Sequence, residues 1–236
     1  MENIELKSEI NKKGTILENT DSSSVKSIYP IQKVLWAGSS QYCNELIIAE
    51  NEQYGKMLFT DGEIQSTSYD EKIYHEFLVH PSINIYCNLQ NKIDLNVLVL
   101  GGGEGSTIRE LLKYPTSIVK KIIWVDIDKD LVDLCKTHLK YCKESIYQDN
   151  RVELKYQDAN IFLENNKILG NKFEIIICDL PDPWINKEEG LYSSAFWDNI
   201  LMNSYKNSII VSHLGPISPG TDNFKLSYEI INQLKL

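Results

Sequence analysis

Two aspartates three positions apart, Asp179 and Asp182, lie at the end of an apolar stretch, in the run DLPDPW. The two prolines of this run prevent it from continuing as a strand or a helix, so both carboxylates are expected on a stiff loop. Because an alkylamine is protonated at neutral pH, it cannot attack carbon until a positioned base removes the proton. The pair could bind an ammonium group and accept that proton. The alternative is a solvated turn in which Asp182 caps the next segment.

A glycine-rich turn lies earlier in the chain, where Asn96–Tyr114 reads NVLVLGGGEGSTIRELLKY. The pattern predicts a strand, a turn and a helix, which is where doubly wound α/β sheets bind nucleotides. It departs from the dinucleotide pattern G-x-G-x-x-G because Ser106 takes the last glycine position. A carboxylate at Glu104 would repel a pyrophosphate and favour an ammonium group, which S-adenosyl nucleosides carry. Such glycines can also serve only the packing of helix on strand, so the turn alone is weak evidence.

The next strand candidates end in acids as well. KIIWVDID contains Asp126, about 25 residues after Gly101, where α/β nucleotide sites place a ribose-binding carboxylate. RVELKYQDA contains Asp158 and KFEIIICD ends at Asp179. The carboxyl ends of parallel strands share one edge of a sheet, so these acids predict a site there for a cationic ligand that is rich in hydroxyl groups.

A β-rich segment precedes the glycine turn. Between about Lys33 and Thr67 the pattern is that of strands, and Asp61-Gly62 favours a two-residue hairpin turn. Ser68 and Glu71 have the spacing of a capping box, which predicts a helix that ends before Pro81. A later segment repeats apolar or thiol side chains at three and four residues and so predicts one buried helix face: Leu131, Leu134, Cys135, His138, Leu139 and Cys142.

These patterns together predict an α/β fold in which a small antiparallel β unit precedes a Rossmann-like, S-adenosyl-nucleoside-binding domain. Residues 1–27 are expected to be a polar tail or a poorly anchored first strand. Residues 28–92 would form the β-hairpin unit with its linking helix, and residues 93–236 the Rossmann-like domain.

Composition limits the classes of function. The 236 residues are 42% hydrophobic and 24% charged, enough for one substantial core and a small second one. The formal net charge of −9 argues against nucleic acid and anionic membranes as partners. The five cysteines form no C-x-x-C pair, which favours reduced core thiols over a zinc site, any other metal site or a disulfide. With no export signal or long apolar run in the sequence, the protein is expected in the cytoplasm.

A set of motifs extends from about Ile31 to Leu214: LFTDGEIQSTSYDEKIYHEFLVHP, VLVLGGGEGSTIRELLKYP, VDID, QDA and DLPDP followed by LYSSAF. With these motifs the chain resembles the spermidine synthase family of polyamine aminopropyltransferases. The first motif is more discriminating than the glycine turn. Glutamate rather than aspartate in that turn resembles the thermospermine synthase branch and some bacterial relatives.

The resemblance implies an activity. Family members bind decarboxylated S-adenosylmethionine as a co-substrate, with no tightly bound cofactor, and transfer its aminopropyl group to a small-molecule di- or polyamine. Methylthioadenosine is released. The resemblance also implies a homodimer or homotetramer.

The resemblance assigns roles to residues as well. Asp179 would be the catalytic proton acceptor, with Asp182 as its partner on the amine. The amine channel would further include Gln65, Tyr74, His75 and Glu104. The nucleoside would be bound by the turn glycines Gly101, Gly103 and Gly105, by Asp126 at the ribose, and by Asp158 with Ala159 at the adenine.

Three departures from the family pattern accompany this resemblance. Tyr42-Cys43 stands where the family usually has an aromatic residue followed by a nucleoside-contacting glutamine, and residues 184–190 replace a common Gly-Pro turn. The sequence ends at Leu236, so the Rossmann-like domain is expected to be shortened at its C-terminus. Two other functions stay open: an S-adenosylmethionine-dependent methyltransferase on the same scaffold, and a non-catalytic protein that binds a nucleoside or a polyamine.

Overall fold

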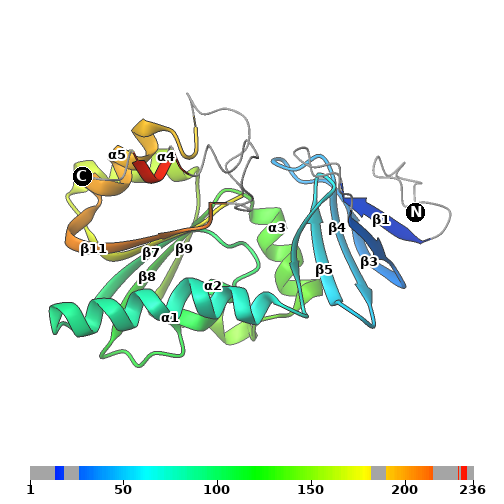
Figure 1. Cartoon of the computed structure of the whole chain (residues 1–236), viewed down its shortest axis with the longest axis horizontal. Helices are drawn as coiled ribbons and strands as arrows, with labels where there is room; N and C mark the ends of the chain where they lie inside the picture. The colour runs from blue at the N-terminus through cyan, green and yellow to red at the C-terminus, as the bar shows by residue number, and fades with distance from the viewer. Residues whose placement is uncertain (1–13, 19–26, 182–189, 215–227, 229, 233–236) are drawn as a thin grey trace. The chain divides into compact units, whose positions relative to one another are not determined.

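The computed structural model describes residues 14–18, 27–181, 190–214, 228 and 230–232 (Figure 1). The chain forms two compact units. The first contains Met1–His75, Gly103–Ser106 and Asp128–Glu144, and the second contains Glu76–Gly102, Thr107–Ile127 and Ser145–Leu236. Two short stretches of the expected Rossmann-like domain therefore belong to the N-terminal unit. Within the described ranges, no helix is both long enough and apolar enough to cross a membrane.

The first unit is built on antiparallel strands, drawn in blue to cyan in Figure 1. A four-stranded sheet in chain order consists of β3 (Lys33–Gly38), β4 (Leu46–Asn51), β5 (Gly55–Thr60) and β6 (Glu63–Thr67). The hairpin predicted at Asp61-Gly62 is confirmed: it joins β5 to β6, and both turn residues have positive φ, 49° and 86°. Two left-handed residues in succession are what a type I′ turn requires, which explains the preference for this dipeptide.

The N-terminal segment contains a strand. For residues 1–27 the sequence allowed either a polar tail or a poorly anchored first strand, and the described part of this segment forms a strand. Strand β1 (Thr15–Glu18) pairs antiparallel with β2 (Ser27–Pro30). Ile16 is fully buried and packs in one cluster with apolar side chains of β4 and β5: Ile47, Ala49, Met57 and Phe59. This apolar contact stabilises β1 despite its polar surroundings in the sequence.

A helical segment packs within the same unit. Helix α3 (Lys129–Leu134) continues into a π-helical turn at Cys135–Leu139. The predicted buried face is confirmed for Cys135 and Leu139, which cluster with apolar side chains of β4 and β5: Leu46, Ile48 and Leu58. The ammonium group of Lys56 donates to the carbonyl oxygens of His138 (2.5 Å) and Leu139 (2.9 Å). These bonds satisfy carbonyls that the end of a helix leaves without partners.

The second unit is a doubly wound α/β layer structure, as the sequence predicted. Its five strands are parallel, in the order β11-β10-β7-β8-β9. They are β7 (Leu95–Gly101), β8 (Val119–Asp126), β9 (Val152–Tyr156), β10 (Phe173–Asp179) and β11 (Ser204–Ser212). The chain order reverses between β7 and β10, and ligands of open α/β sheets bind outside the carboxyl ends of the strands at such a reversal.

Helices cover both faces of this sheet (Figure 1). Helices α4 (Ala159–Leu169) and α5 (Ser194–Met202) lie on one face, and α2 (Ser106–Leu111) lies on the other with the second-unit part of α1 (Glu71–Gln90). The core between the sheet and α4 and α5 includes Leu98, Ile176, Phe162, Leu163, Phe196 and Trp197.

Helix α1 differs from its prediction at both ends. It runs on to Gln90 with Pro81 inside, although the sequence predicted an end before the proline. Pro81 lacks the N–H that would bond the carbonyl of Phe77. The helix continues because its buried face, which includes Leu78 and Val79 before the proline, goes on after it at Ile83 and Tyr86. At the start, the predicted capping box is wrong, since Ser68 Oγ accepts a hydrogen bond from the backbone N–H of Lys56 at 3.0 Å.

Candidate functional site

Three of the predicted acids lie at one edge of the parallel sheet. Asp126 is the last residue of β8, Asp158 follows β9 by two residues, and Asp179 is the last residue of β10. Gly101 ends β7 between them in the sheet order. The second unit thus gathers a glycine turn and three carboxylates at the carboxyl ends of neighbouring parallel strands.

Asp179 is bonded directly to the glycine turn. The backbone N–H of Gly102 donates to the carbonyl oxygen of Asp179 at 2.8 Å. A Cβ at Gly101 would lie 2.1 Å from that same oxygen, and one at Gly102 would lie 2.8 Å from Asp179 Oδ2. Both glycines also have positive φ, 81° and 71°. At Gly101 and Gly102, therefore, the need for glycine is explained by the close approach of Asp179.

The turn has a second anchor in the sheet. The indole N–H of Trp124, a fully buried residue of β8, donates to the carbonyl oxygen of Gly101 at 2.9 Å. At the next pair of strands, the backbone N–H of Gln157, which directly follows β9, donates to the carbonyl oxygen of Asp126 at the end of β8, at 3.0 Å. Side-chain and backbone bonds between strands thus hold the ends of β7 and β8.

Asp158 has a structural role in addition to any role in binding. Its Oδ1 accepts hydrogen bonds from the backbone N–H groups of Asn160 (2.8 Å) and Ile161 (3.2 Å) and so caps α4. Ala159 is the first residue of that helix and is buried. The acid was predicted from the sequence and the cap was not, although an aspartate followed by a helical pattern is the usual signal for a helix N-cap.

The LYSSAF motif anchors the chain that follows Asp179. The Tyr192 hydroxyl, which is buried, donates to the carbonyl oxygens of Pro181 (3.0 Å) and His213 (3.3 Å). Ser193 Oγ accepts from the backbone N–H of Phe196 at 3.2 Å and caps α5. Tyr192 carries no signal in the sequence that predicts this anchoring role. Asp182 and residues 184–189 lie outside the described residues.

In the first unit, a histidine lies between two carboxylates. His75 Nδ1 is 2.5 Å from the carbonyl oxygen of Glu71 and 3.4 Å from its Oε2, and His75 Nε2 is 3.5 Å from Glu104 Oε1. The side chain of His75 is 1% exposed and that of Glu104 is 14% exposed. Of the four residues predicted for the amine channel, the structure brings His75 and Glu104 together. It adds Glu71, for which the sequence suggested only a capping role.

Burial and His75 act in opposite directions on the pKa of Glu104. Burial disfavours the charged carboxylate, but the polar ring of His75, whose Nε2 lies 3.5 Å from Glu104 Oε1, favours it more, so the pKa of Glu104 lies below the ordinary 4.5. The glycine turn therefore carries a negative charge at neutral pH. This is the property that the sequence predicted for a site that prefers an ammonium group to a phosphate.

A histidine variant tests this electrostatic assignment. We expect His75→Leu to raise the pKa of Glu104 and to lower the free energy of unfolding at pH 7 by about 1.5 to 3 kcal/mol, the usual value of a hydrogen bond to a charged group. The wild-type contribution is present above the unfolded pKa and is lost as the pH falls through the folded pKa. The deficit measured by urea unfolding should therefore shrink on acidification. A deficit that does not shrink when the pH is lowered through the folded pKa of Glu104 would contradict the assignment.

The other two predicted channel residues are placed differently. The ring of Tyr74 packs edge-on against that of His75, with 4.9 Å between centroids. Gln65 is exposed on β6, and its amide lies 3.5 Å from the carbonyl oxygen of Glu63. Tyr74 is thus next to the carboxylate–histidine cluster, whereas the amide of Gln65 contacts a carbonyl oxygen of its own strand.

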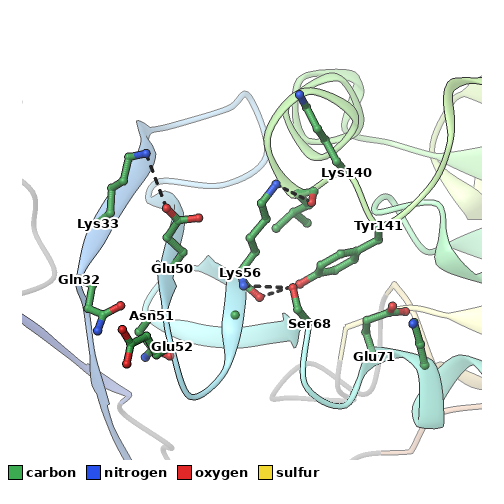
Figure 2. Close-up of a pocket in the computed structure, with 13 residues that line it drawn as sticks. Gln32, Lys33, Glu50, Asn51, Glu52, Lys56, Ser68, Glu71, Lys140 and Tyr141 are labelled. Atoms are coloured by element: carbon green, nitrogen blue, oxygen red, sulfur yellow. Dashed lines mark hydrogen bonds and ion pairs between the residues drawn. The ribbon is translucent and has the colours of Figure 1, made fainter.

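A hollow of about 590 Å³ lies in the first unit, and Figure 2 shows residues that line it. Its lining is dominated by charged side chains, among them Lys33, Glu50, Glu52, Lys72 and Lys140. Lys33 pairs with Glu50 at 3.6 Å, and the hydroxyl of Tyr141 donates to the carbonyl oxygen of Lys56 at 2.9 Å. The hollow adjoins the cluster around His75 through Glu71, while its lining contains none of Gln65, Tyr74, His75 and Glu104.

Cys43, one of the departures from the family pattern, is a buried residue of the first unit. Cys43 is buried with apolar residues of β4 and β5, and its thiol donates to the carbonyl oxygen of Glu45 at 2.8 Å. Burial, followed by the charge of Asp61, raises its pKa to about 11. Cys43 therefore packs in the core of the first unit. All five cysteines are free thiols.

Sequence profiles of known families match this chain in two blocks. Residues 71–228 match the spermine/spermidine synthase domain, and residues 16–68 match the spermidine synthase tetramerisation domain. The polyamine aminopropyltransferase of Pyrobaculum calidifontis is 38% identical over 172 residues, which cover 72% of this chain and 57% of that protein. Thermospermine synthase ACAULIS5 of Arabidopsis thaliana is 35% identical over 204 residues, which cover 84% of this chain and 56% of that protein.

A solved structure agrees with these matches. The crystal structure of a spermidine synthase in complex with the transition state analogue AdoDATO superposes with a TM-score of 0.79 at 25% identity, over 94% of this chain and 72% of that chain. The matches to the two curated relatives span little more than half the length of those proteins. Because the two family profiles together match most of its residues, the chain belongs to the spermine/spermidine synthase family.

Proposed function

We propose that this chain carries aminopropyltransferase chemistry: transfer of the aminopropyl group of decarboxylated S-adenosylmethionine to a di- or polyamine, with release of methylthioadenosine. The observation that carries the proposal is the placement of Asp179, a carboxylate at the carboxyl end of β10 that is bonded to the glycine turn after β7. The names of the two relatives and of the solved structure support it.

Asp179 would act as the general base. It removes a proton from the ammonium group of the acceptor, and the freed lone pair attacks the aminopropyl carbon that is bonded to the sulfonium. A carbon–nitrogen bond forms as the carbon–sulfur bond breaks. The electron pair of the broken bond stays on sulfur, which leaves as the neutral thioether methylthioadenosine, and Asp179 later returns its proton to solvent.

The nucleoside would be held at the edge of the parallel sheet. Asp126 would accept hydrogen bonds from the two ribose hydroxyls, and Asp158 with Ala159 would contact the adenine. The turn that contains Gly101, Gly103 and Gly105 would lie against the nucleoside. These roles rest on the positions of the residues at the carboxyl ends of β7, β8 and β9 and on the family motifs that they match.

The amine would be recognised by negative charge. Glu104, whose pKa is lowered beside His75, would attract ammonium groups and repel the carboxylate of intact S-adenosylmethionine. This observation favours the decarboxylated co-substrate. Gln65, Tyr74 and His75 would complete the channel, and Asp182 would bind the amine beside Asp179.

Mass spectrometry of the products tests the proposal. The protein is incubated with a panel of diamines and polyamines and with either S-adenosylmethionine or its decarboxylated form. We expect a mass gain of one aminopropyl group, only with the decarboxylated form, and formation of methylthioadenosine. A gain of one methyl group would instead indicate a methyltransferase, and binding without turnover a non-catalytic relative. The Asp179→Asn variant is the matched control for products that form without the base.

We further propose that the protein assembles as a homodimer or homotetramer through the first unit. The match of residues 16–68 to a tetramerisation domain supports this. We expect sedimentation equilibrium at micromolar concentration to give a mass of two or four chains. A single species with the mass of one chain would exclude the assembly.

A further inference from the structure

We propose that Thr107 is a positioning residue for Asp179. Its Oγ1 donates a hydrogen bond to Asp179 Oδ2 at 2.6 Å. This distance lies in the range of about 2.5 to 2.7 Å that is typical of a hydroxyl bonded to an ionised carboxylate. Thr107 is fully buried as the second residue of α2, and although it lies within the glycine-turn motif, that motif gave it no role of its own.

The hydroxyl adds a restraint on Asp179 to those that the glycine turn provides. The N–H of Gly102 fixes the main chain of Asp179, and the missing side chain of Gly102 leaves room for its carboxylate. Neither contact fixes the rotation of the carboxylate. The bond from Thr107 restrains this rotation, because it holds Oδ2 of Asp179 against a buried residue of α2. A base must be held close to its productive geometry to act, so this restraint bears directly on proton transfer.

The bond is also expected to favour the charged form of Asp179. A hydrogen bond donated to a carboxylate favours its ionised form, which is the form that accepts a proton. The titratable neighbour along β10 is Cys178, whose pKa is raised to about 12, first by burial and then by the charge of Asp179. That thiol therefore stays neutral at neutral pH. Removal of the threonine hydroxyl is thus expected to raise the proton affinity of Asp179 and to loosen its orientation.

This inference rests on the proposed role of Asp179 as proton acceptor. We compare Thr107→Val, which keeps the shape but removes the donor, with Thr107→Ser, which keeps the donor. With decarboxylated S-adenosylmethionine and an accepted amine, Thr107→Val should lower kcat by about tenfold to a hundredfold and leave methylthioadenosine affinity unchanged. The acid limb of its kcat–pH profile should move to higher pH. Thr107→Ser should restore most of kcat and the wild-type limb.

A second readout does not depend on activity. Carbon-13 labelling of aspartate carboxyl groups, with Asp179 assigned from the Asp179→Asn spectrum, allows its pKa to be measured by NMR. We expect Thr107→Val to raise this pKa by about one unit and Thr107→Ser to leave it unchanged. The matched control is Thr67→Val, because Thr67 Oγ1 donates to Asp70 Oδ1 at the same 2.6 Å. That control should not move the Asp179 titration.

The outcomes separate the two proposals. If the wild-type protein transfers no aminopropyl group, the proposed function fails, and the NMR titration alone decides the role of Thr107. If Thr107→Val changes neither kcat nor the pKa of Asp179, or if Thr107→Ser is as impaired as Thr107→Val, the positioning role is overturned. Should Thr107→Val fail to fold, Thr107→Ala removes the hydroxyl without adding bulk and is held to the same criteria.

Discussion

Replacement of Asp179 by asparagine is expected to lower kcat by about 10²- to 10⁴-fold, the usual contribution of general base assistance. Asparagine keeps the shape of the side chain and can still accept the bond from Thr107, but it cannot take a proton. Affinity for methylthioadenosine should stay nearly unchanged in calorimetry, since the variant alters the amine side of the reaction. The loss should therefore appear in the chemical step.

The dependence on pH identifies the missing function. As the pH rises toward the pKa of the amine, more acceptor arrives unprotonated, so the Asp179→Asn enzyme should recover relative to wild type. Asp182→Asn is the comparison. A lost ammonium contact weakens ground state and transition state together, so this variant should mainly raise KM for the amine. Full turnover of Asp179→Asn at neutral pH, or no recovery at high pH, would mean that another residue is the base. Tyr74 and His75 would then be the next candidates.

Replacement of Asp126 by alanine is expected to weaken methylthioadenosine binding by about 1.5 to 3 kcal/mol for each charged hydrogen bond that is lost to the ribose. The carboxylate lies at the end of β8, and the carbonyl oxygen of Asp126 is already bonded to Gln157, so the backbone should keep its place. Titration calorimetry measures the change, and circular dichroism checks that the variant is folded.

A charge control accompanies this variant. Asp133→Ala removes one carboxylate from α3, where Asp133 is half exposed and pairs with Lys129. It should leave nucleoside affinity unchanged, because Asp133 is not among the predicted binding residues. The loss of its ion pair should also change the stability of the fold little, since surface ion pairs contribute little to stability. Unchanged affinity in a folded Asp126→Ala protein would remove Asp126 from the ribose site.

The sequence was sufficient for the elements with strong local signals. Apolar runs that end in acids predicted β8 and β10, and Asp61-Gly62 predicted the hairpin between β5 and β6. These features depend on residues a few positions apart, whose periodicity and turn preferences act locally. Because parallel strands share an edge, the same signals also predicted where Asp126, Asp158 and Asp179 would gather.

Local signals failed where a distant partner changed their meaning. Pro81 predicted the end of a helix, but α1 continues past it because burial of its apolar face offsets the loss of one backbone hydrogen bond. Ser68 had the spacing of a cap, but its hydroxyl accepts from Lys56 on the neighbouring strand. Ile16 stands in a polar segment and forms a strand because residues more than thirty positions later cover it.

What the sequence determined by itself is the order of elements, the acidic edge of the sheet and the identity of the candidate base. What only the tertiary structure decided is how that base is held. Thr107 and Asp179 are 72 positions apart, and their contact exists because β10 pairs with β7 and thereby reaches the turn that leads into α2. No periodicity or local motif encodes such a contact, since it follows from the strand order of the folded sheet.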